Sequence, residues 1–333
     1  MKWGRRAVLK AYAGTFVMAP AIVRGQGRLR LSLDTTLPDA SFHTVNCRRF
    51  AAEVRQATGG AVDIDVKSGG QLGFTGAESL RAVRDGLVPL AAYLNLQQVG
   101  DEPFLGIDGL PFLAASAAEL KVLQTHIRPG YDEVAARNNQ TILYVVPWPG
   151  QYLHLKARAE SADALKGIKI RVADKSTQQM LAAIGMAPVV IPWAETRPVL
   201  ASGAVSGVST SAVSGADGKL WEFLKFFHAT NHQWSAEIVA INNDAFRKIG
   251  ADHRRVIADI ARKLEPEFWE SALQQDKDGT AKLTDAGMVR VAVSDAMLAE
   301  LRRRTAPLID DFMKRVPLSR APISAYLAEL KRA

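Results

Sequence analysis

The chain has almost no cysteine: Cys47 is the only one among 333 residues. A single thiol cannot form an internal disulfide, so the fold has to be held by its core. A chain of about 300 residues buries enough apolar surface to do so. Cys47 lies in the stretch "FHTVNCRRFAAEV", which predicts a helix. A cysteine there is more typical of a small core residue than of a nucleophile.

The sequence also lacks the short motifs of common enzyme sites. No H-E-x-x-H, C-x-x-C, phosphate-loop or G-x-S-x-G pattern is present, and no G-x-G-x-x-G follows the first predicted strand. His228 and His232 are four apart, but "FFHATNHQW" predicts a strand or loop, not the helix that would bring both onto one metal. We therefore expect no cofactor and no metal, and a binding protein rather than an enzyme. Because catalytic residues can lie far apart in sequence, an exported hydrolase remains an alternative.

Long apolar runs are missing as well, since no internal segment reaches the roughly 18 residues that span a bilayer. The N-terminus has a different character. Basic residues come first, a short apolar stretch follows at 11–23, and Ala19 and Ala21 form an A-x-A-like cleavage site. We predict a signal peptide over residues 1–25 and a periplasmic mature protein. The pair Arg5-Arg6 favours the twin-arginine type; an ordinary secretory signal with two arginines is the alternative.

The positive charge of the chain comes largely from this leader. Residues 1–25 hold five basic side chains and no acid, so their removal lowers the formal net charge from +8 to +3. A nucleic-acid-binding protein needs basic residues clustered on one face. The mature part has no basic cluster interleaved with aromatic residues, so we expect no nucleic-acid partner.

What the sequence does contain is an alternation of strand and helix patterns from residue 28 onward. Apolar alternation at 28–33, 61–68, 87–95 and 141–146 is separated by helical periodicity. The same alternation continues through 167–210, and a long helical stretch covers 244–275, expected to bend or break near Pro266. This pattern predicts an α/β fold with two α/β domains and mixed sheets.

A late strand after the second group of elements indicates that the chain crosses between the domains more than once. The prolines and glycine of "VVPWPGQ", at 145–151, mark the best boundary. We therefore assign 26–148 plus 237–275 to the first domain. Residues 149–236 plus 276–333 form the second domain and the C-terminal helices.

One strand ends in an unusual way. In "LKGIKIRVADKS", residues 165–176, Ile168 and Ile170 alternate with Lys169 and Arg171 directly before a predicted helix. Ligands of α/β proteins usually bind at such strand ends. Arg171 is therefore either a surface charge or the anchor of an anionic ligand.

Several segments, taken together and in order, resemble a known family. They are "TGGAVDIDVKSGGQLG", "ESLRAVRDG", "DGLPFL", "LKGIKIRV", "IGMAPVVIPWAE", "LASGAVSGV" and "FLKFFHATNH". Over residues 28–315 the chain is similar to the DctP-type substrate-binding proteins of tripartite ATP-independent periplasmic (TRAP) transporters. The resemblance implies a periplasmic-binding-protein type II-like fold, in which crossing strands and a long helix join two domains that close on a ligand.

The resemblance also implies roles for particular residues and partners. Arg171 takes the position of the family's arginine that forms a two-pronged salt bridge with the ligand carboxylate, a geometry that lysine does not reproduce. Trp193 takes the position of the aromatic residue that packs on the ligand. The implied partners are a small organic acid and the small and large TRAP membrane subunits, and we expect a monomer without enzymatic activity.

The chain departs from the family where other members carry charge. Gln151 stands where sialic-acid-binding members carry a second arginine, twenty positions before Arg171, and Ser209 and Thr210 stand where many members carry an acid and an asparagine. Neutral and aromatic side chains are the further candidates for ligand binding: Tyr93, Asn95, Trp148 and Trp234. Because an unpaired buried charge is costly, this pocket predicts a monocarboxylate with an apolar or aromatic body, such as a 2-oxo or 2-hydroxy acid. A C4-dicarboxylate or a sugar acid is the alternative.

Overall fold

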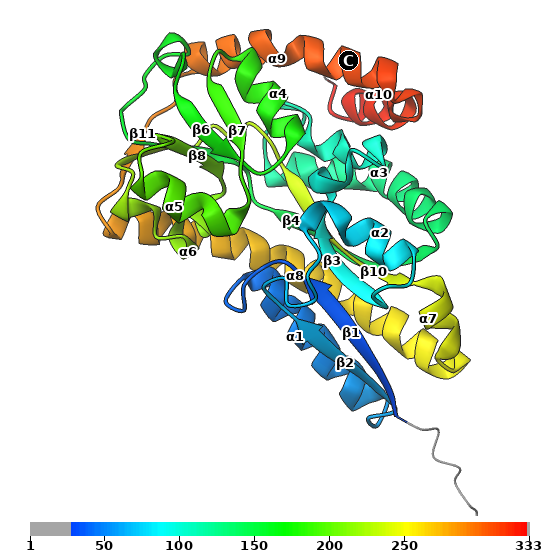
Figure 1. Cartoon of the computed structure of the whole chain (residues 1–333). Coiled ribbons are helices and arrows are strands. Elements are labelled where there is room, and N and C mark those ends of the chain that lie inside the picture. The colour runs from blue at the N-terminus through cyan, green and yellow to red at the C-terminus, as the bar shows by residue number, and fades with distance from the viewer. Residues whose placement is uncertain (1–27, 332–333) are drawn as a thin grey trace, which may run out of the picture.

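The computed structural model describes residues 28–331 and contains two mixed β-sheets flanked by helices (Figure 1). The strand order is β2-β1-β3-β10-β4 in the first sheet and β11-β9-β5-β8-β6-β7 in the second. Each sheet combines strands from distant parts of the chain. The prediction of an α/β fold with two mixed-sheet units is confirmed. The predicted leader, 1–25, lies outside the described residues.

The first sheet is built mainly from the N-terminal part of the chain. Its strands are β1 (Leu29–Thr35), β2 (Val62–Lys67), β3 (Leu90–Leu94), β4 (Gln140–Trp148) and β10 (Ser235–Asn242). Between and beside them lie the helices α1 (Phe42–Ala57), α2 (Ser79–Arg84), α3 (Ala117–Arg137) and α7 (Asn243–Lys248).

The second sheet follows from the middle of the chain. Its strands are β5 (Tyr152–Leu155), β6 (Lys169–Val172), β7 (Ala187–Val190), β8 (Gly207–Thr210), β9 (Phe226–His228) and β11 (Val289–Val291). The helices that accompany it are α4 (Lys175–Ala183), α5 (Thr196–Ala201) and α6 (Ala212–Asp217).

The chain crosses between the two sheets in two segments, 149–151 and 229–234, and both segments lie at the edges where the parallel strands end. β10 runs antiparallel to β3, so the carboxyl end of β3 lies beside the amino end of β10, where the chain returns from the second sheet. In the second sheet, Thr210 at the end of β8 pairs with Tyr152 at the start of β5, where the chain arrives. The carboxyl ends of the parallel strands of both sheets therefore face the crossing segments 149–151 and 229–234. Such edges are where α/β proteins bind ligands.

A single long helix also spans both halves. Of the bend or break expected near Pro266, the break is absent, because α8 (Ala251–Asp285) is continuous through Pro266; the helices are separated at Gly250 instead. Glu265 accepts a hydrogen bond from the backbone N–H of Val145 at 3.2 Å, which ties α8 to β4. Asp276 accepts one from the backbone N–H of Ala212 at 3.1 Å, which ties α8 to α6 of the second half.

The C-terminal helices return across the molecule. α9 (Asp295–Arg315) packs on α4, whereas α10 (Arg320–Glu329) packs on α3 beside the first sheet (Figure 1). Tyr326 of α10 donates a hydrogen bond to the carbonyl of Leu113 at 3.0 Å. The sequence analysis grouped 276–333 with the second domain and the C-terminal helices, and of these helices α10 contacts the first half. Among the described helices, none combines the length and apolar composition needed to cross a membrane.

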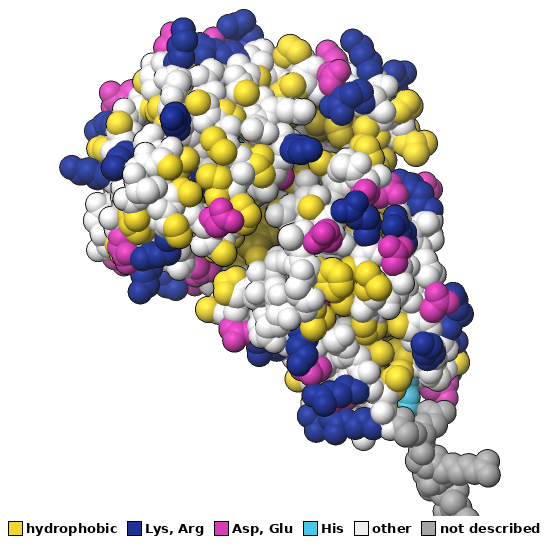
Figure 2. Space-filling model, viewed as in Figure 1, with side chains coloured by type: hydrophobic (Ala, Val, Ile, Leu, Met, Phe, Trp, Pro, Cys, Tyr) yellow, Lys and Arg dark blue, Asp and Glu magenta, His cyan; other side chains and the backbone are white. Residues whose placement is uncertain are grey.

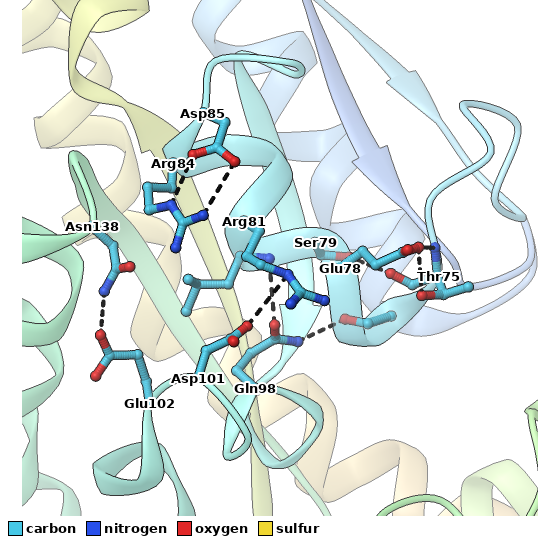
Figure 3. A network of polar contacts seen from close by, with 12 residues as sticks. Thr75, Glu78, Ser79, Arg81, Arg84, Asp85, Gln98, Asp101, Glu102 and Asn138 are labelled. Carbon is cyan, nitrogen blue, oxygen red and sulfur yellow. Dashed lines mark hydrogen bonds and ion pairs between the residues drawn. The ribbon is translucent and has the colours of Figure 1, made fainter.

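A polar network holds the segment that follows β3 (Figure 3). Gln98 accepts a hydrogen bond from the backbone N–H of Leu80 at 3.4 Å and donates to the carbonyl of Gly76 at 2.7 Å. Arg81 and Asp101 form an ion pair at 3.5 Å next to it. These contacts fix α2 against the turn that begins at Asn95, and this turn shapes the carboxyl edge of the first sheet.

Candidate functional site

Arg171 is the central residue of the second sheet's carboxyl edge. It is the last-but-one residue of β6, opposite Val208 of β8 and Val189 of β7. Its side chain is only 3 % exposed. Nε donates to the carbonyl of Ile191 at 2.9 Å, and within residues 28–331 the guanidinium forms no ion pair with a carboxylate. The two terminal nitrogens thus remain able to grip a carboxylate with parallel hydrogen bonds.

The charge of Arg171 is costly in this position. Burial lowers the pKa of its guanidinium to about 10, and the nearby Asp174 carboxyl opposes this shift. Arg171 is therefore cationic at neutral pH although it is almost fully removed from water. A buried cation without an ion-pair partner is a strong indication of an anion-binding site.

The carboxyl group of Asp174 serves a structural purpose behind this arginine. It caps α4, accepting hydrogen bonds from the backbone N–H of Thr177 at 2.8 Å and from its hydroxyl at 2.6 Å. The Thr177 hydroxyl also lies 2.7 Å from Gln233 Oε1, and Gln233 donates to the carbonyl of Gly109 at 3.1 Å. A chain of polar contacts thus links the helix after Arg171 to the crossing segment and to the first half.

Trp193 lies directly beside Arg171. The guanidinium carbon lies 5.3 Å from the centroid of the indole ring, which is a cation–π contact. The ring is half-buried, and its far edge packs so closely on Gly218 that a Cβ atom there would lie 3.0 Å from it. Trp193 is therefore held against the cation by its surroundings, as expected for a residue that covers a bound carboxylate.

Ser209 and Thr210 end β8 next to β6, and the two residues form different hydrogen bonds. Ser209 Oγ lies 3.0 Å from His232 Nε2, and His232 Nδ1 lies 2.7 Å from the Thr230 hydroxyl. Burial lowers the pKa of His232 to about 3, so the imidazole is neutral. The serine–histidine pair has a threonine where a hydrolase places a carboxylate. Thr210 accepts a hydrogen bond from His154 through its carbonyl, at 3.2 Å.

The first half contributes an aromatic and acidic group at the facing edge. Trp148, the last residue of β4, lies with its ring 4.3 Å from that of His43 and 5.4 Å from that of Phe42. Its indole N–H donates to Glu237 at 3.1 Å. Burial raises the pKa of the Glu237 carboxyl to about 8, so this acid is mostly protonated at neutral pH. The surface is hollowed between the two halves, and hydrophobic side chains are visible inside the hollow (Figure 2).

Near this edge lie buried polar groups that the sequence analysis did not single out. They come from the end of β1 and the first turns of α1, and they have no hydrogen-bond partner among the described residues: both carboxylate oxygens of Asp34, Nε2 of His43, Oγ1 of Thr44 and Nδ2 of Asn46. The sequence pattern places these residues but does not mark them as unusual. An acid ends a predicted strand, and His43 and Asn46 lie on the helix face that packs inward.

Three of the candidate ligand-binding residues face the interior of the first half instead. Trp234 donates to the carbonyl of Ala114 at 3.0 Å, and the Tyr93 hydroxyl donates to Gln140 at 3.2 Å. The side-chain amide of Asn95 is fully buried and fully hydrogen-bonded to protein groups. We therefore remove these three from the ligand-binding set. Their polar atoms are already satisfied, so a ligand would have to displace protein contacts to reach them.

Gln151 lies in the crossing segment itself. Its side-chain amide donates to the carbonyl of Pro149 at 2.9 Å, and its backbone N–H donates to the carbonyl of Gln233. It is half-buried and remains a candidate. Within residues 28–331, no three His, Cys, Asp or Glu side chains are placed to hold a metal ion together.

Two α/β halves that face each other across crossing segments, with a buried cation at one edge, define a two-domain solute-binding protein. The comparisons agree with this class. The family model "Bacterial extracellular solute-binding protein, family 7" (DctP) matches residues 34–315. The chain belongs to this family and is a DctP-type TRAP substrate-binding protein.

Individual relatives agree with this assignment. A solute-binding protein of Albidiferax ferrireducens is 26% identical over 281 residues, covering 81% of this chain and 82% of the relative. Bordetella pertussis DctP7, an extracytoplasmic solute receptor binding pyroglutamic acid, is 27% identical with a TM-score of 0.86, over 90% of this chain and 99% of DctP7. A marine metagenome TRAP solute-binding protein specific for pyroglutamate is 28% identical with a TM-score of 0.85, over the same shares.

Proposed function

We propose that this chain captures a small organic monocarboxylate in the periplasm and delivers it to TRAP membrane subunits. The observation that carries this proposal is Arg171, a buried cation whose terminal nitrogens are available at the edge that faces the other half. Gln151 stands where an arginine would receive a second carboxylate, and Ser209 and Thr210 leave the end of β8 uncharged. The two relatives of known structure, both above 25% identity, bind pyroglutamate, itself a monocarboxylate, which supports this class.

A thermal-shift screen of organic acids tests the proposal, because a ligand that binds only the folded state raises the melting temperature. We expect monocarboxylates, including 2-oxo and 2-hydroxy acids, to stabilise the protein more than succinate or malate. A larger shift with the dicarboxylates would favour the alternative ligand class. Turnover of esters or amides would favour the hydrolase alternative; the neutral Ser209–His232 pair, without a carboxylate behind it, argues against this.

Replacing Trp193 should weaken binding of ligands with a large apolar body more than binding of ligands with a small one. Loss of an aromatic contact costs roughly 0.5–1.5 kcal/mol in addition to the free energy of burying the apolar surface. Trp193→Ala should therefore weaken binding of an aromatic acid such as phenylpyruvate by about threefold to tenfold. Pyruvate should lose less. Trp221, also half-buried in the second half, is the matched control, and Trp221→Ala should leave both affinities unchanged. Equal losses for the two acids, as measured by calorimetry, would contradict packing of Trp193 on the ligand body.

We further propose that the leader directs export by the twin-arginine route. Replacing both Arg5 and Arg6 with lysine should retain the precursor in the cytoplasm, because that route reads the arginine pair. N-terminal sequencing of the periplasmic protein should find a start between Ala21 and Arg28. Undiminished export of the double variant would indicate the ordinary secretory route, and an uncleaved N-terminus would indicate a membrane anchor.

A further inference from the structure

One buried acid of the first half has no cation beside it. Glu237 is only 3 % exposed, and within residues 28–331 its carboxyl group takes part in no ion pair. Among the same residues, its hydrogen-bond donor is the indole N–H of Trp148, at 3.1 Å. A buried carboxylate without a cation is costly, so such a group keeps a proton instead. Glu237 is thus mostly uncharged at neutral pH, in agreement with its pKa of about 8.

The uncharged titratable groups around Glu237 keep their protonation state near pH 8. These groups are Cys47 and His43 of α1, Tyr93 of β3 and Tyr144 of β4. Burial raises the pKa of Cys47 to about 12 and holds the pKa of both tyrosines well above its usual value. Burial also holds the pKa of His43 well below its usual value. A change of charge near pH 8 at this edge therefore belongs to Glu237.

The charged side chains of the same surroundings are paired with each other. Glu265 of α8, whose pKa burial raises, binds Arg128 of α3 at 2.8 Å. On α1, Arg48 binds Asp39. Neither pair leaves a cation for Glu237, so a proton neutralises its carboxyl group.

Glu237 lies on the face of the first sheet that α8 covers. Its partner across the sheet is Val146 of β4, and paired residues of neighbouring strands point to the same face. Val146 belongs to the same apolar cluster as Phe268 of α8. On its other side Glu237 pairs with Leu94, the last residue of β3. The acid is therefore on the α8 face, at the carboxyl edge that faces the crossing segments.

Arg171 lies on the corresponding face of the second sheet. It pairs with Val208 of β8, which belongs to the same apolar cluster as Leu283 of α8. Val213 of α6, from the second half, packs into the cluster of the first half. Figure 1 shows α8 running along both halves. Glu237 and Arg171 thus lie on the same side of the crossing segments, over one helix, at the two edges that face each other.

We propose that Glu237 makes ligand capture depend on a proton: a carboxylate binds at Arg171 while Glu237 is uncharged, and ionisation of Glu237 opposes this binding. The inference rests on the proposed function, because Arg171 must hold the ligand carboxylate. Like charges in a site closed to water repel, so an ionised Glu237 disfavours an anionic ligand. Where Glu237 is ionised in the free protein, each bound carboxylate is accompanied by one proton taken from solvent. The same proton returns to solvent when the ligand leaves.

The indole of Trp148 tunes the pH at which this happens. Its N–H donates to Glu237 and lowers the pKa of the carboxyl group, in opposition to burial. The ring is held in place, with its centroid 4.3 Å from that of His43 and 5.4 Å from that of Phe42. A hydrogen bond to a carboxylate favours the ionised form. Trp148→Phe removes this bond and should therefore move the midpoint of the pH dependence to higher pH.

Calorimetric titration between pH 6 and pH 9 tests the proposal. The probes are L-pyroglutamate, pyruvate and the tightest-binding monocarboxylate of the thermal-shift screen, all ionised throughout this range. With one linked proton, the parent should bind about tenfold more weakly at pH 9 than at pH 7. At pH 9, titrations in buffers of different ionisation enthalpy should show uptake of about one proton per ligand.

Variants assign the pH dependence to Glu237. Glu237→Gln has the same shape, still accepts from the indole N–H, and cannot ionise, so its affinity should stay nearly constant up to pH 9. A loss that remains in this variant belongs to Arg171, whose pKa is about 10. Glu267→Gln is the matched control, because Glu267 is a half-buried acid of α8 that is paired with Arg49. It should show the pH profile of the parent.

The stability of the ligand-free protein provides a second readout. The pKa of Glu237 is raised from its usual value of 4.5, so the folded state holds this proton more tightly than the unfolded state. The stability that the proton provides is present below the usual value and is lost as the pH rises toward 8. The melting temperature of the parent, relative to that of Glu237→Gln, should therefore fall between pH 5 and pH 8.

The outcomes separate this inference from the proposed function. Affinity that does not change with pH, an equal loss in the parent and in Glu237→Gln, or a constant difference in melting temperature would overturn the proton dependence. In each of these cases, carboxylate capture through Arg171 would still stand. If no acid of the screen binds at any pH, the proposed function is wrong, and the proton dependence falls with it.

Discussion

Arg171→Ala should weaken binding of the ligand carboxylate by about thirtyfold to several thousandfold. Removing one partner of a desolvated, hydrogen-bonded charge pair costs roughly 2–5 kcal/mol, and about 1.4 kcal/mol corresponds to tenfold. The guanidinium is almost fully buried, so water cannot replace it at the ligand. Arg171→Lys should restore only part of the affinity, because the charge returns without two parallel donors. Calorimetric titration of both variants measures these losses.

Arg302 provides the matched control for this prediction. Its guanidinium also lies over an aromatic ring, 5.8 Å from the centroid of Phe112, but the side chain is exposed. Arg302→Ala should bind ligand like the parent protein. The ligand-free Arg171→Ala variant should still unfold cooperatively, because its guanidinium forms no ion pair within residues 28–331. If Arg171→Ala binds as tightly as the parent, the carboxylate anchor is misassigned.

Asn95→Ala should have its large effect on stability rather than on recognition. The Asn95 amide donates to the carbonyl of Leu105 at 2.8 Å and to the Asp108 carboxyl at 2.6 Å, and its oxygen accepts from the backbone N–H of Ala236 at 2.9 Å. Each buried group left unsatisfied costs about 1–3 kcal/mol. With at least two groups affected, the free energy of unfolding should fall by roughly 2–6 kcal/mol.

Chemical denaturation followed by fluorescence measures this loss. Gln97→Ala is the control, because Gln97 belongs to the same turn but is only half-buried; its loss should be far smaller. The folded fraction of Asn95→Ala should keep most of its ligand affinity. A variant with parental stability and abolished binding would instead return Asn95 to the ligand-binding set.

The contrast between Arg171 and Asn95 illustrates what the sequence could and could not predict. The strand–helix alternation predicted two α/β units, because period-two and period-3.6 patterns follow directly from burial of one face. Arg171 could be recognised as a candidate ligand-binding residue, because it is a charged residue at the end of a strand and lies in the motif "LKGIKIRV". Asn95 was chosen for its position after a strand, but whether its amide faces a ligand or the core depends on Leu105 and Asp108, which lie ten and thirteen residues away.

At the first strand and the first helix, the sequence analysis instead missed residues whose burial is unusual. Asp34, His43 and Asn46 are ordinary in sequence, since polar residues often end strands and begin helices. Their significance arises only in the folded structure, where they are buried and their polar atoms have no protein partners among the described residues. A single sequence does not reveal which polar residues become buried in this way, because the burial comes from contacts between distant segments.

The most direct test of the account is a crystal structure of the protein saturated with the tightest-binding acid from the screen. The account predicts that both carboxylate oxygens lie at hydrogen-bond distance, about 2.7–2.9 Å, from the two terminal nitrogens of Arg171. The indole ring of Trp193 should cover the ligand next to that pair. A ligand carboxylate bound elsewhere, with the Arg171 guanidinium unoccupied, would contradict the account.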